Sequence, residues 1–552
     1  MIHLITIFSK SMLESPINRL FIPALWICGT LFSAPTMAQT PVQSDSQHAG
    51  FDASEFDAYV QRAVDKGEVP GLAIVVVKDD SVVFAKGYGV RELGGDEPVD
   101  MNTLFTIFSN TKAMTAAALG MLVDEGKLHW DDPVVDHLPS FRLQDPNHTA
   151  QVRVRDLITH NAGLPDTDFL WVDPATSMDE ILQRLPHVAE EYPIRSGFIY
   201  QNVMYGVAGE VIEAVSGTPW ADFFQARIFE PVGMDRSVPT LAEASSRDNV
   251  ARTHRGVGDD QRIVGNRSVD PVGPAGSAWS SAADMSRWIR FLLRGCTTEN
   301  GHRLLHEETC EELFSPQTVA PIGLHAFDEI TRPNWVTYGL GWFQQDYKGR
   351  KIDFHLGGGM GSVVGLMRDE NLGVFVVGNR NTSQRQALMY RVFDLFTEGP
   401  TRDWSAEMKA FYTDRAANIA RNRTEAEAEL RASRAPNTAP SLPFGDYVGR
   451  YEHPLYGSVR VDQSADGLRW TYAGSSGRLE HWHYDTFRYW PDDPELAGGA
   501  LTTFHLNGSG LPKAVTTGSM EFTRVEVPGR RTVISVDRRK SRGLSASARI
   551  GS

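Results

Sequence analysis

A serine and a lysine three residues apart, Ser109 and Lys112, open an apolar segment that predicts a buried helix, "FTIFSNTKAMTAAALGML". Residues three apart project from one face of a helix, so we expect the hydroxyl to lie beside the amine. Free amides at a helix N-terminus favour negative charge developing on that hydroxyl. Burial lowers the pKa of a lysine, which can then accept or relay the serine proton. The alternative for this motif alone is a capping serine followed by a lysine whose stem packs on apolar surface.

A tyrosine and an asparagine, Tyr200 and Asn202, lie two residues apart in "SGFIYQNVMYGVAGEVI", just before another predicted helix. In extended backbone, residues i and i+2 point to the same side, so both side chains are expected to face one pocket. Free tyrosine has a pKa of about 10. We expect a neighbouring cation to lower the pKa of Tyr200 enough to make it a base. The alternative is a tyrosine that only packs on a loop.

A histidine followed by glycines, "FHLGGGMGSVVG", forms a third candidate group. His355 is predicted on a strand, and Gly358 could bring its backbone N–H close to a substrate without a side-chain clash. The glycines lead into another strand rather than a helix, so they are no nucleotide-binding fingerprint. The alternative for His355 is a core histidine with satisfied hydrogen bonds.

The composition is that of a large globular protein, with 552 residues, 41% of them hydrophobic and 22% charged. The formal net charge of −15 would repel a phosphate backbone, so no nucleic-acid partner is expected. No Cys/His set has the spacing of a zinc site, and His481 and His483 would share one strand face without further ligands. We therefore expect neither a metal nor a cofactor.

The N-terminus has the pattern of an export signal, because Arg19 precedes the apolar run "LFIPALWICGTLFSA". That run has the length of a signal peptide rather than a membrane span, and we expect residues 1–38 to be removed by cleavage after Ala38. The alternative is a membrane anchor, and translation could also start at Met12. We expect a periplasmic or secreted protein without a stable membrane span.

Cysteine use leaves one question open. Cys28 lies in the expected signal peptide, which leaves Cys296 and Cys310 in the exported chain. An oxidising compartment permits a bridge between them, but two buried thiols remain the alternative.

The elements that must position these residues follow the order strands, helices, strands. "GLAIVVVKDDSVVFAKGYGV" predicts a hairpin, a helical middle extends to about Leu293, and strands return around "KIDFHLGGGMGSVVGLMRDENLGVFVVGNRN". Such a chain most simply builds one antiparallel sheet from both ends, with helices packed on it. The fold class is therefore α+β over residues 39–400.

The C-terminal part has a different pattern. Residues 401–444 predict a charged helical connector and a Pro-rich linker, "APNTAPSLPFG". Short alternating strands with Gly and Asp-Gly turns then predict a small all-β module over residues 445–537. Residues 538–552 are basic and Ser-rich, and we interpret them as a frayed tail.

In order and spacing, the three groups "SNTK", "YQN" and "HLG" resemble the serine β-lactamase and penicillin-binding-protein superfamily. The branch is that of class C β-lactamases, D-aminopeptidases, D,D-peptidases and related esterases. Supporting phrases are "VPGLAIVVV", "VRDLITHNAGLP", "FEPVGMDRS", "AGSAWSSAADMSRWI" and "YGLGWF". The resemblance covers about residues 51–380, and the terminal module more weakly resembles a lipocalin-like domain appended to some of these peptidases.

The resemblance implies a role for each matched residue. Ser109 would be the nucleophile, Lys112 its proton acceptor, and Tyr200 the general base that also protonates the leaving group. Asn202 would orient Lys112 and the substrate amide, and His355 would supply polarity near Tyr200. The backbone amides of Ser109 and Gly358 would form the oxyanion hole, where each donor contributes about 3–4 kcal/mol.

One departure from the family pattern bears on the substrate. Leu356 stands where many relatives carry a Thr or Ser hydroxyl that helps hold a substrate carboxylate, and His355 replaces the lysine of true class C β-lactamases. We therefore expect an exported serine hydrolase that cleaves amide bonds of small or unusual peptides. The alternatives are a broad carboxylesterase, a β-lactamase, a penicillin-binding sensor without turnover, or a scaffold. A homo-oligomer is possible, and the expected partner is a small peptide or ester substrate.

Overall fold

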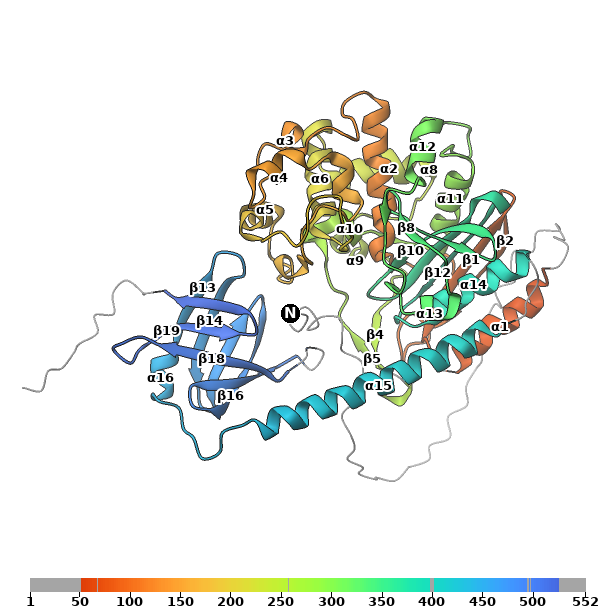
Figure 1. Cartoon of the computed structure of the whole chain (residues 1–552). Helices are drawn as coiled ribbons and strands as arrows, with labels where there is room; N and C mark the ends of the chain where they lie inside the picture. Colours follow the sequence, from red (N-terminus) through yellow and green to blue (C-terminus); the bar gives the residue numbers. More distant parts are fainter. Residues whose placement is uncertain are drawn as a thin grey trace, which may run out of the picture.

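The computed structural model describes residues 51–525 except 67, 257, 398–401, 494–495 and 497. The expected signal peptide (1–38) and basic tail (538–552) lie outside the described residues. Figure 1 shows an α+β part and a small β-barrel, connected by the long helix α15 (Trp404–Ala432). The predicted α+β class with a separate C-terminal all-β module is confirmed.

One antiparallel sheet forms the centre of the α+β part, with the strand order β2-β1-β12-β11-β10-β9-β8-β7. Its strands are β1 (Gly71–Lys78), β2 (Ser81–Gly89), β7 (Thr318–Val319), β8 (Val336–Tyr338), β9 (Phe343–Tyr347), β10 (Arg350–Gly357), β11 (Ser362–Met367) and β12 (Leu372–Gly378). The pairing of Leu72 with Gly378 joins the first strand to the last, so both ends of the domain build one sheet. The sequence predicted this arrangement.

Both faces of the sheet are covered, which explains the continuous apolar run in β1. Ile74 and Val76 face a core that includes residues of α1 (Ala53–Asp65) and α14 (Gln384–Thr397). Val75 and Val77 face the opposite core, which includes residues of α11 (Ala282–Leu293).

The helical middle packs around α2 (Thr111–Asp124), the helix predicted after Ser109. Its residues from Thr111 to Leu122 are all buried, as expected for a helix that is apolar all round. Around it lie α3 (Val134–His137), α4 (Pro146–Gln151), α5 (Met178–Arg184), α6 (Val203–Ser216), α7 (Trp220–Phe224), α8 (Glu230–Val232), α9 (Leu241–Ser245), α10 (Gly273–Gly276) and α12 (Glu307–Leu313). Two small sheets pair β3 (Phe105–Thr106) with β6 (Trp279–Ser280) and β4 (Thr253–Arg255) with β5 (Arg262–Val264).

Cys296 and Cys310 form a disulfide, which decides the pairing that the sequence left open. The bridge attaches α12 to the segment that follows α11. Over the part of the chain that the structure describes, no helix combines the length and apolar character of a membrane span.

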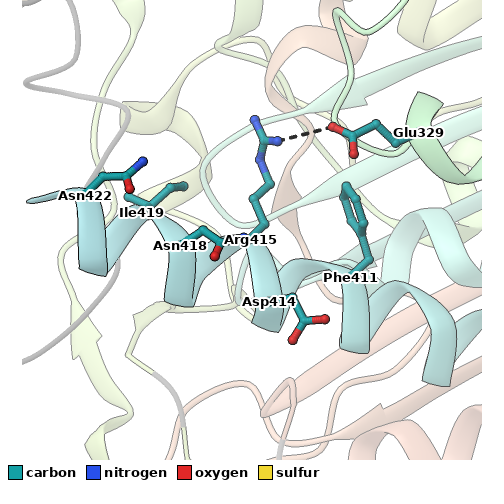
Figure 2. A pocket seen from close by; sticks show the side chains of 7 residues that line it. All are labelled: Glu329, Phe411, Asp414, Arg415, Asn418, Ile419 and Asn422. Carbon is teal, nitrogen blue, oxygen red and sulfur yellow. Dashed lines mark hydrogen bonds and ion pairs between the residues drawn. The ribbon is translucent and has the colours of Figure 1, made fainter.

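Helix α15 extends from the α+β part toward the barrel (Figure 1). Only Trp404 and Met408 near its start are buried. A pocket of about 350 Å³ lies between α15 and α13 (Asp328–Thr331), and Arg415 pairs with Glu329 across it at 3.5 Å (Figure 2). None of the residues that line this pocket belongs to the three sequence motifs.

The C-terminal module is a closed barrel of β13 (Gly449–His453), β14 (Gly457–Ser464), β15 (Gly467–Tyr472), β16 (Ser475–His483), β17 (Thr486–Pro491), β18 (Ala500–Leu506), β19 (Pro512–Thr517) and β20 (Met520–Arg524). The Pro-rich segment before it differs from a free linker. Leu442 and Phe444 pack against the barrel core, and Ser441 bonds the Asp485 carboxylate through its backbone N–H at 2.9 Å. Short helix α16 (Phe444–Tyr447) then leads into β13.

Candidate active site

Ser109 lies on a tight 3-10 turn, Phe108–Asn110, immediately before α2. Phe108 has a positive φ of 46°, a backbone strain that holds the following serine at the turn. The Phe108 ring packs against Gly359, where an added Cβ would come within 1.8 Å of it, so only glycine fits there. Ser109 is half-buried and therefore reachable from solvent.

Lys112 is fully buried one helical turn after the serine. Its Nζ lies 3.2 Å from Ser109 Oγ, 2.7 Å from Asn202 Oδ1 and 2.8 Å from the Ala275 carbonyl oxygen. Burial lowers the pKa of Lys112 from 10.5 to about 7, and the negative charge of Asp168 opposes that shift. The predicted direction of the shift is thus found, with burial as its main cause.

Tyr200 lies beside the same amine, with its ring centroid 4.8 Å from Lys112 Nζ. Burial raises the pKa of Tyr200 above its usual value, and a hydrogen bond with the Ser109 side chain opposes this rise only in part. Our expectation that a cation lowers the pKa of Tyr200 was wrong, because desolvation by burial raises it and the negative charge of Asp168 adds to the rise. At neutral pH the phenol therefore keeps its proton and can donate it.

Asn202 connects the lysine to a carboxylate that our sequence reasoning missed. Its amide nitrogen donates to both oxygens of Asp168, at 2.9 and 3.0 Å, while its oxygen accepts from Lys112. Trp171 also donates to Asp168, at 3.0 Å. Burial raises the pKa of Asp168 and these donors oppose the rise. The acidic segment "PDTDFLWVDP" could have suggested a carboxylate, but not its partner.

His355 lies at the end of β10 and is almost fully buried. Its Nε2 hydrogen-bonds the Tyr338 hydroxyl at 3.1 Å, and Tyr338 in turn contacts the Tyr205 hydroxyl at 3.2 Å. Burial, with help from the nearby Lys112 charge, holds the pKa of His355 well below its usual value. The imidazole is therefore neutral, and its ring centroid lies 6.3 Å from that of Tyr200.

The end of β10 extends past its neighbour β9, because the pairing of these strands stops at Phe354. The space beside Gly358 is open, since an added Cβ would meet nothing within 4 Å. Arg385 of α14 donates to the Gly357 carbonyl oxygen and to that of Ser362, which fixes the strand end to β11. The open position at Gly358 is where the sequence reasoning expects the second oxyanion donor beside Ser109.

His160 is a second residue that the sequence reasoning did not single out, although it lies in the quoted phrase "VRDLITHNAGLP". Its ring centroid is 4.2 Å from that of Tyr200 and 4.4 Å from that of Tyr338.

Within the described residues, no group of three His, Cys, Asp or Glu side chains could hold a metal ion.

Comparison with known families agrees with this geometry. Residues 56–395 match the family model described as Beta-lactamase. The chain belongs to the beta-lactamase family. Residues 433–530, which include the barrel, match a domain of unknown function, DUF3471. The family match includes Ser109, Lys112, Tyr200, Asn202 and His355.

Among curated proteins, this member of the beta-lactamase family is similar to the unguisins hydrolase of Aspergillus violaceofuscus. The two are 27% identical over 469 residues, which cover 79% of each chain. It is also 25% identical to protein flp of Staphylococcus aureus over 342 residues, covering 59% of this chain and 63% of that protein. A hydrolase is thus supported by fold and by relatives.

Two solved structures share the fold. The octameric penicillin-binding protein homologue from Pyrococcus abyssi has a TM-score of 0.56 and 21% identity, covering 86% of this chain and 100% of that one. SurE has a TM-score of 0.52 and 21% identity, covering 86% and 99%. At this identity the likeness extends to the fold alone.

Proposed function

We propose that this protein is a serine hydrolase that forms an acyl-enzyme on Ser109 and cleaves amide bonds of small peptides. The observation that carries the proposal is the environment of Lys112. Two acceptors, Asn202 Oδ1 and the Ala275 carbonyl oxygen, take the two hydrogens of a neutral amine. The remaining lone pair then faces Ser109 Oγ at 3.2 Å and can accept its proton.

In the proposed acylation, Ser109 Oγ bonds the carbonyl carbon while its proton passes to Lys112. The amides of Ser109 and Gly358 stabilise the oxyanion. The tetrahedral intermediate then breaks its C–N bond, and the leaving nitrogen takes a proton from the Tyr200 hydroxyl, which Lys112 reprotonates. Water attacks the acyl group in the second half, its proton goes back through Tyr200 and Lys112, and Ser109 regains its hydrogen as the acid leaves.

The raised pKa of Tyr200 supports assigning it to proton relay rather than to a standing phenolate base. The lowered pKa of Lys112, about 7, supports assigning the base to this residue, because a good general base has a pKa near the working pH. This division of labour revises the roles that the family resemblance implied.

The substrate class rests on the relatives and on β10. One relative is named for hydrolysis of unguisins, and the related fold of SurE has been solved with D-Leu. We propose amides and short peptides that include D-residues such as D-leucine. On β10 the neutral His355 and the apolar Leu356 offer little to a substrate carboxylate, which counts against β-lactams.

An esterase is the second candidate, and the same observation favours it. A strand without its own cation or hydroxyl beside the oxyanion site suits a neutral acyl group, and esters need less leaving-group protonation than amides. Hydrolysis of esters would still require Ser109 and Lys112 but would depend less on Tyr200.

A side-by-side substrate panel tests the proposal. Purified protein is offered L- and D-leucine anilides, short peptide amides, p-nitrophenyl esters and nitrocefin, and its Ser109 is labelled with a fluorophosphonate. We expect anilide or peptide hydrolysis, labelling at Ser109, and loss of both in Ser109→Ala. Labelling that persists in Ser109→Ala would refute the nucleophile, whereas a stable adduct without turnover would favour a sensor.

We also propose export through cleavage after Ala38, which the apolar leader supports and with which the Cys296–Cys310 bridge is compatible. N-terminal sequencing of the protein from fractionated cells should begin at Gln39. A homo-oligomer is a further proposal, supported by the octameric relative from Pyrococcus abyssi, and light scattering of the purified protein measures it.

A further inference from the structure

His160 is a buried titratable residue that the proposed reaction leaves without a role. Only 1% of its surface is exposed, and its backbone has a positive φ of 61° although it is not glycine. Such a conformation persists only where surrounding contacts hold it, and it concentrates at functional positions.

The hydrogen bonds of His160 lie on both sides of Tyr200. The Ile199 backbone N–H donates to the His160 carbonyl oxygen at 3.0 Å. The Gln201 backbone N–H donates to His160 Nδ1, also at 3.0 Å. One residue therefore accepts the backbone N–H groups of both residues next to Tyr200, one through its main chain and one through its imidazole.

The imidazole also supports the tyrosine ring. It packs against the Tyr200 ring in a tilted arrangement with an interplanar angle of 34°, and Tyr338 lies against it at a centroid distance of 4.4 Å. Because Nδ1 accepts a proton donor, the neutral ring carries its own hydrogen on Nε2. Among the described residues, Nε2 has no hydrogen-bond partner. A buried polar atom without a partner lowers the stability of the fold, so the imidazole is present here despite that loss.

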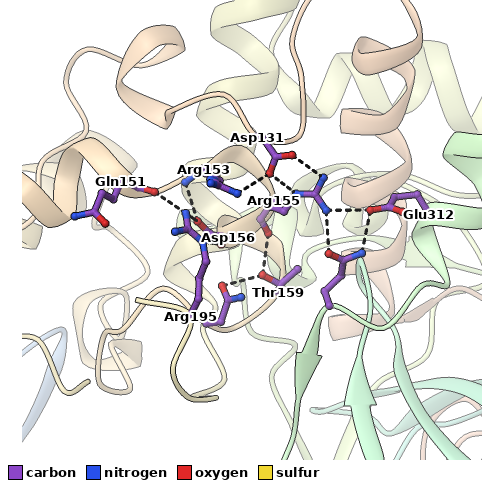
Figure 3. Close-up of polar contacts among 10 residues, drawn as sticks. Asp131, Gln151, Arg153, Arg155, Asp156, Thr159, Arg195 and Glu312 are labelled. Atoms are coloured by element: carbon purple, nitrogen blue, oxygen red, sulfur yellow. Dashed lines mark hydrogen bonds and ion pairs between the residues drawn. The ribbon is translucent and has the colours of Figure 1, made fainter. Parts of the chain in front are cut away.

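The segment that carries His160 is itself fixed by a polar network (Figure 3). Arg195 pairs with Asp156 at 2.5 Å. Its backbone N–H donates to the Asn161 carbonyl oxygen at 2.9 Å. Thr159 donates to the Asn161 side chain at 3.0 Å. These contacts fix the segment around His160 against the segment that leads to Tyr200.

We propose that His160 is the positioning residue for Tyr200, setting the phenol against Ser109 through the Nδ1 bond to Gln201 and the imidazole packed on the Tyr200 ring. The inference rests on the proposed function, because it assigns Tyr200 to proton relay there. It predicts a loss in kcat with little change in KM, since substrate binding does not involve the imidazole. The pH dependence set by Lys112 should stay unchanged, because the lysine keeps its own partners.

Two variants separate the acceptor from the ring. His160→Asn keeps a side-chain acceptor near the Nδ1 position and tolerates positive φ, whereas His160→Phe keeps a ring and loses the acceptor. We expect kcat to fall about 100-fold in His160→Phe and to stay within about tenfold of wild type in His160→Asn. Equal losses in the two variants, or no loss in either, would overturn the proposal.

A matched control excludes a general effect of removing a buried imidazole. His254 is also fully buried and accepts the Leu93 backbone N–H through Nε2 at 3.1 Å. It lies on β4, and His254→Asn should keep the wild-type kcat. A loss in His254→Asn as large as that in His160→Phe would count against a specific role.

A double-mutant cycle with Tyr200→Phe tests whether His160 acts through Tyr200, even if one single variant folds poorly. If His160 acts through Tyr200, adding His160→Phe or His160→Asn to Tyr200→Phe should lower kcat by less than about twofold further. An undiminished further loss, or an acid limb of kcat/KM that moves up from pH 7 in the single variants, would show disruption of the whole site instead. Failure of this inference stays distinct from failure of the function, because Ser109→Ala must abolish activity in either case.

Discussion

Two clusters of buried aromatic and polar groups in this chain use the same residue types in opposite ways. In the barrel, the Tyr451 hydroxyl donates to the Tyr447 carbonyl oxygen at 2.8 Å, and Tyr447 donates to the Asp485 carboxylate. Beside Ser109, the buried Lys112 has no carboxylate in direct contact among the described residues and bonds neutral groups instead. The barrel pairs its polar groups with carboxylate or carbonyl oxygens for stability, whereas the α+β part surrounds Lys112 with neutral acceptors, as the proposed proton transfer requires.

The largest effect should come from removing that amine. In Lys112→Met we expect kcat to fall by about 10²–10⁴-fold, the usual contribution of a general base. The folded protein should become more stable at neutral pH, because an apolar side chain of similar length needs no desolvation. Kinetics and thermal unfolding of the same preparation measure both effects.

The pH dependence of that stability difference has a definite sign. The pKa of Lys112 is about 7 in the folded state and 10.5 when the chain is unfolded. Between these values the unfolded chain binds more protons, so wild-type stability rises with pH. The gap between Lys112→Met and wild type should therefore be widest below pH 7 and close as the pH approaches 10.5.

Lys348 contrasts with Lys112 because it forms an ion pair with a carboxylate. Its Nζ pairs with the buried Asp394 carboxylate at 2.7 Å. Lys348→Met should lower the melting temperature, because the carboxylate loses its cation, and kcat should remain at the wild-type value. A stabilised Lys348→Met would mean that charge pairing does not distinguish structural from catalytic lysines here.

The second prediction concerns the barrel core. Phe504 is nearly buried and packs on Tyr447 at a centroid distance of 4.9 Å and on Phe487 at 5.6 Å. Phe504→Ala should destabilise the barrel by about 3–5 kcal/mol. Hydrolysis of a small substrate should continue with kcat within about twofold of wild type, because the ring contacts of Phe504 are with Tyr447, Tyr451 and Phe487 inside the barrel. Loss of kcat in step with barrel unfolding would abolish the contrast between the two regions.

The third prediction concerns the effect of the Asp168 charge on the pKa of Lys112. Asp168 raises the pKa of Lys112, so Asp168→Asn should lower it further and move the acid limb of kcat/KM below pH 7 by about half a unit to one unit. The rate rises through this limb because the neutral amine is the active form. Asp166→Asn is the matched control, since Asp166 does not figure among the charges that act on Lys112. A limb that moves upward in Asp168→Asn would contradict the assignment.

Much of the fold could be predicted because the periodicity is strong. The apolar run of β1, the buried helix α2 and the Asp466–Gly467 turn of the barrel each have one simple structural solution. The spacing of Ser109 with Lys112 and of Tyr200 with Asn202 also indicated which side chains share a face. The Lys112 pKa followed from burial alone.

The rest depends on irregular backbone that no periodicity encodes. His160 and Arg195 both have positive φ, and the contacts between their segments join residues far apart in the sequence. Asp168 reaches Asn202 through a loop, so its partner could not be deduced from spacing. Tyr200 was misjudged because the depth of burial around its ring, which raises its pKa, comes from four separate segments.

The smallest expected effect lies where the two regions meet. The hairpin between β13 and β14 places Leu455 in the core of the catalytic part, and Tyr456 packs on Phe169 at a centroid distance of 5.0 Å. Phe169 directly follows Asp168, which holds Asn202 and, through it, Lys112.

Tyr456→Ala removes an aromatic contact that is worth about 0.5–1.5 kcal/mol, which corresponds to roughly two- to tenfold in rate. We expect kcat/KM to fall within that range through a loosened Asp168 loop. Tyr484→Ala, at an exposed barrel turn, is the control and should leave kcat/KM unchanged. If kcat/KM of Tyr456→Ala equals that of the control, the barrel does not act on the Ser109 site through the hairpin. If kcat/KM falls as expected, the barrel contributes to the geometry of the Ser109 site.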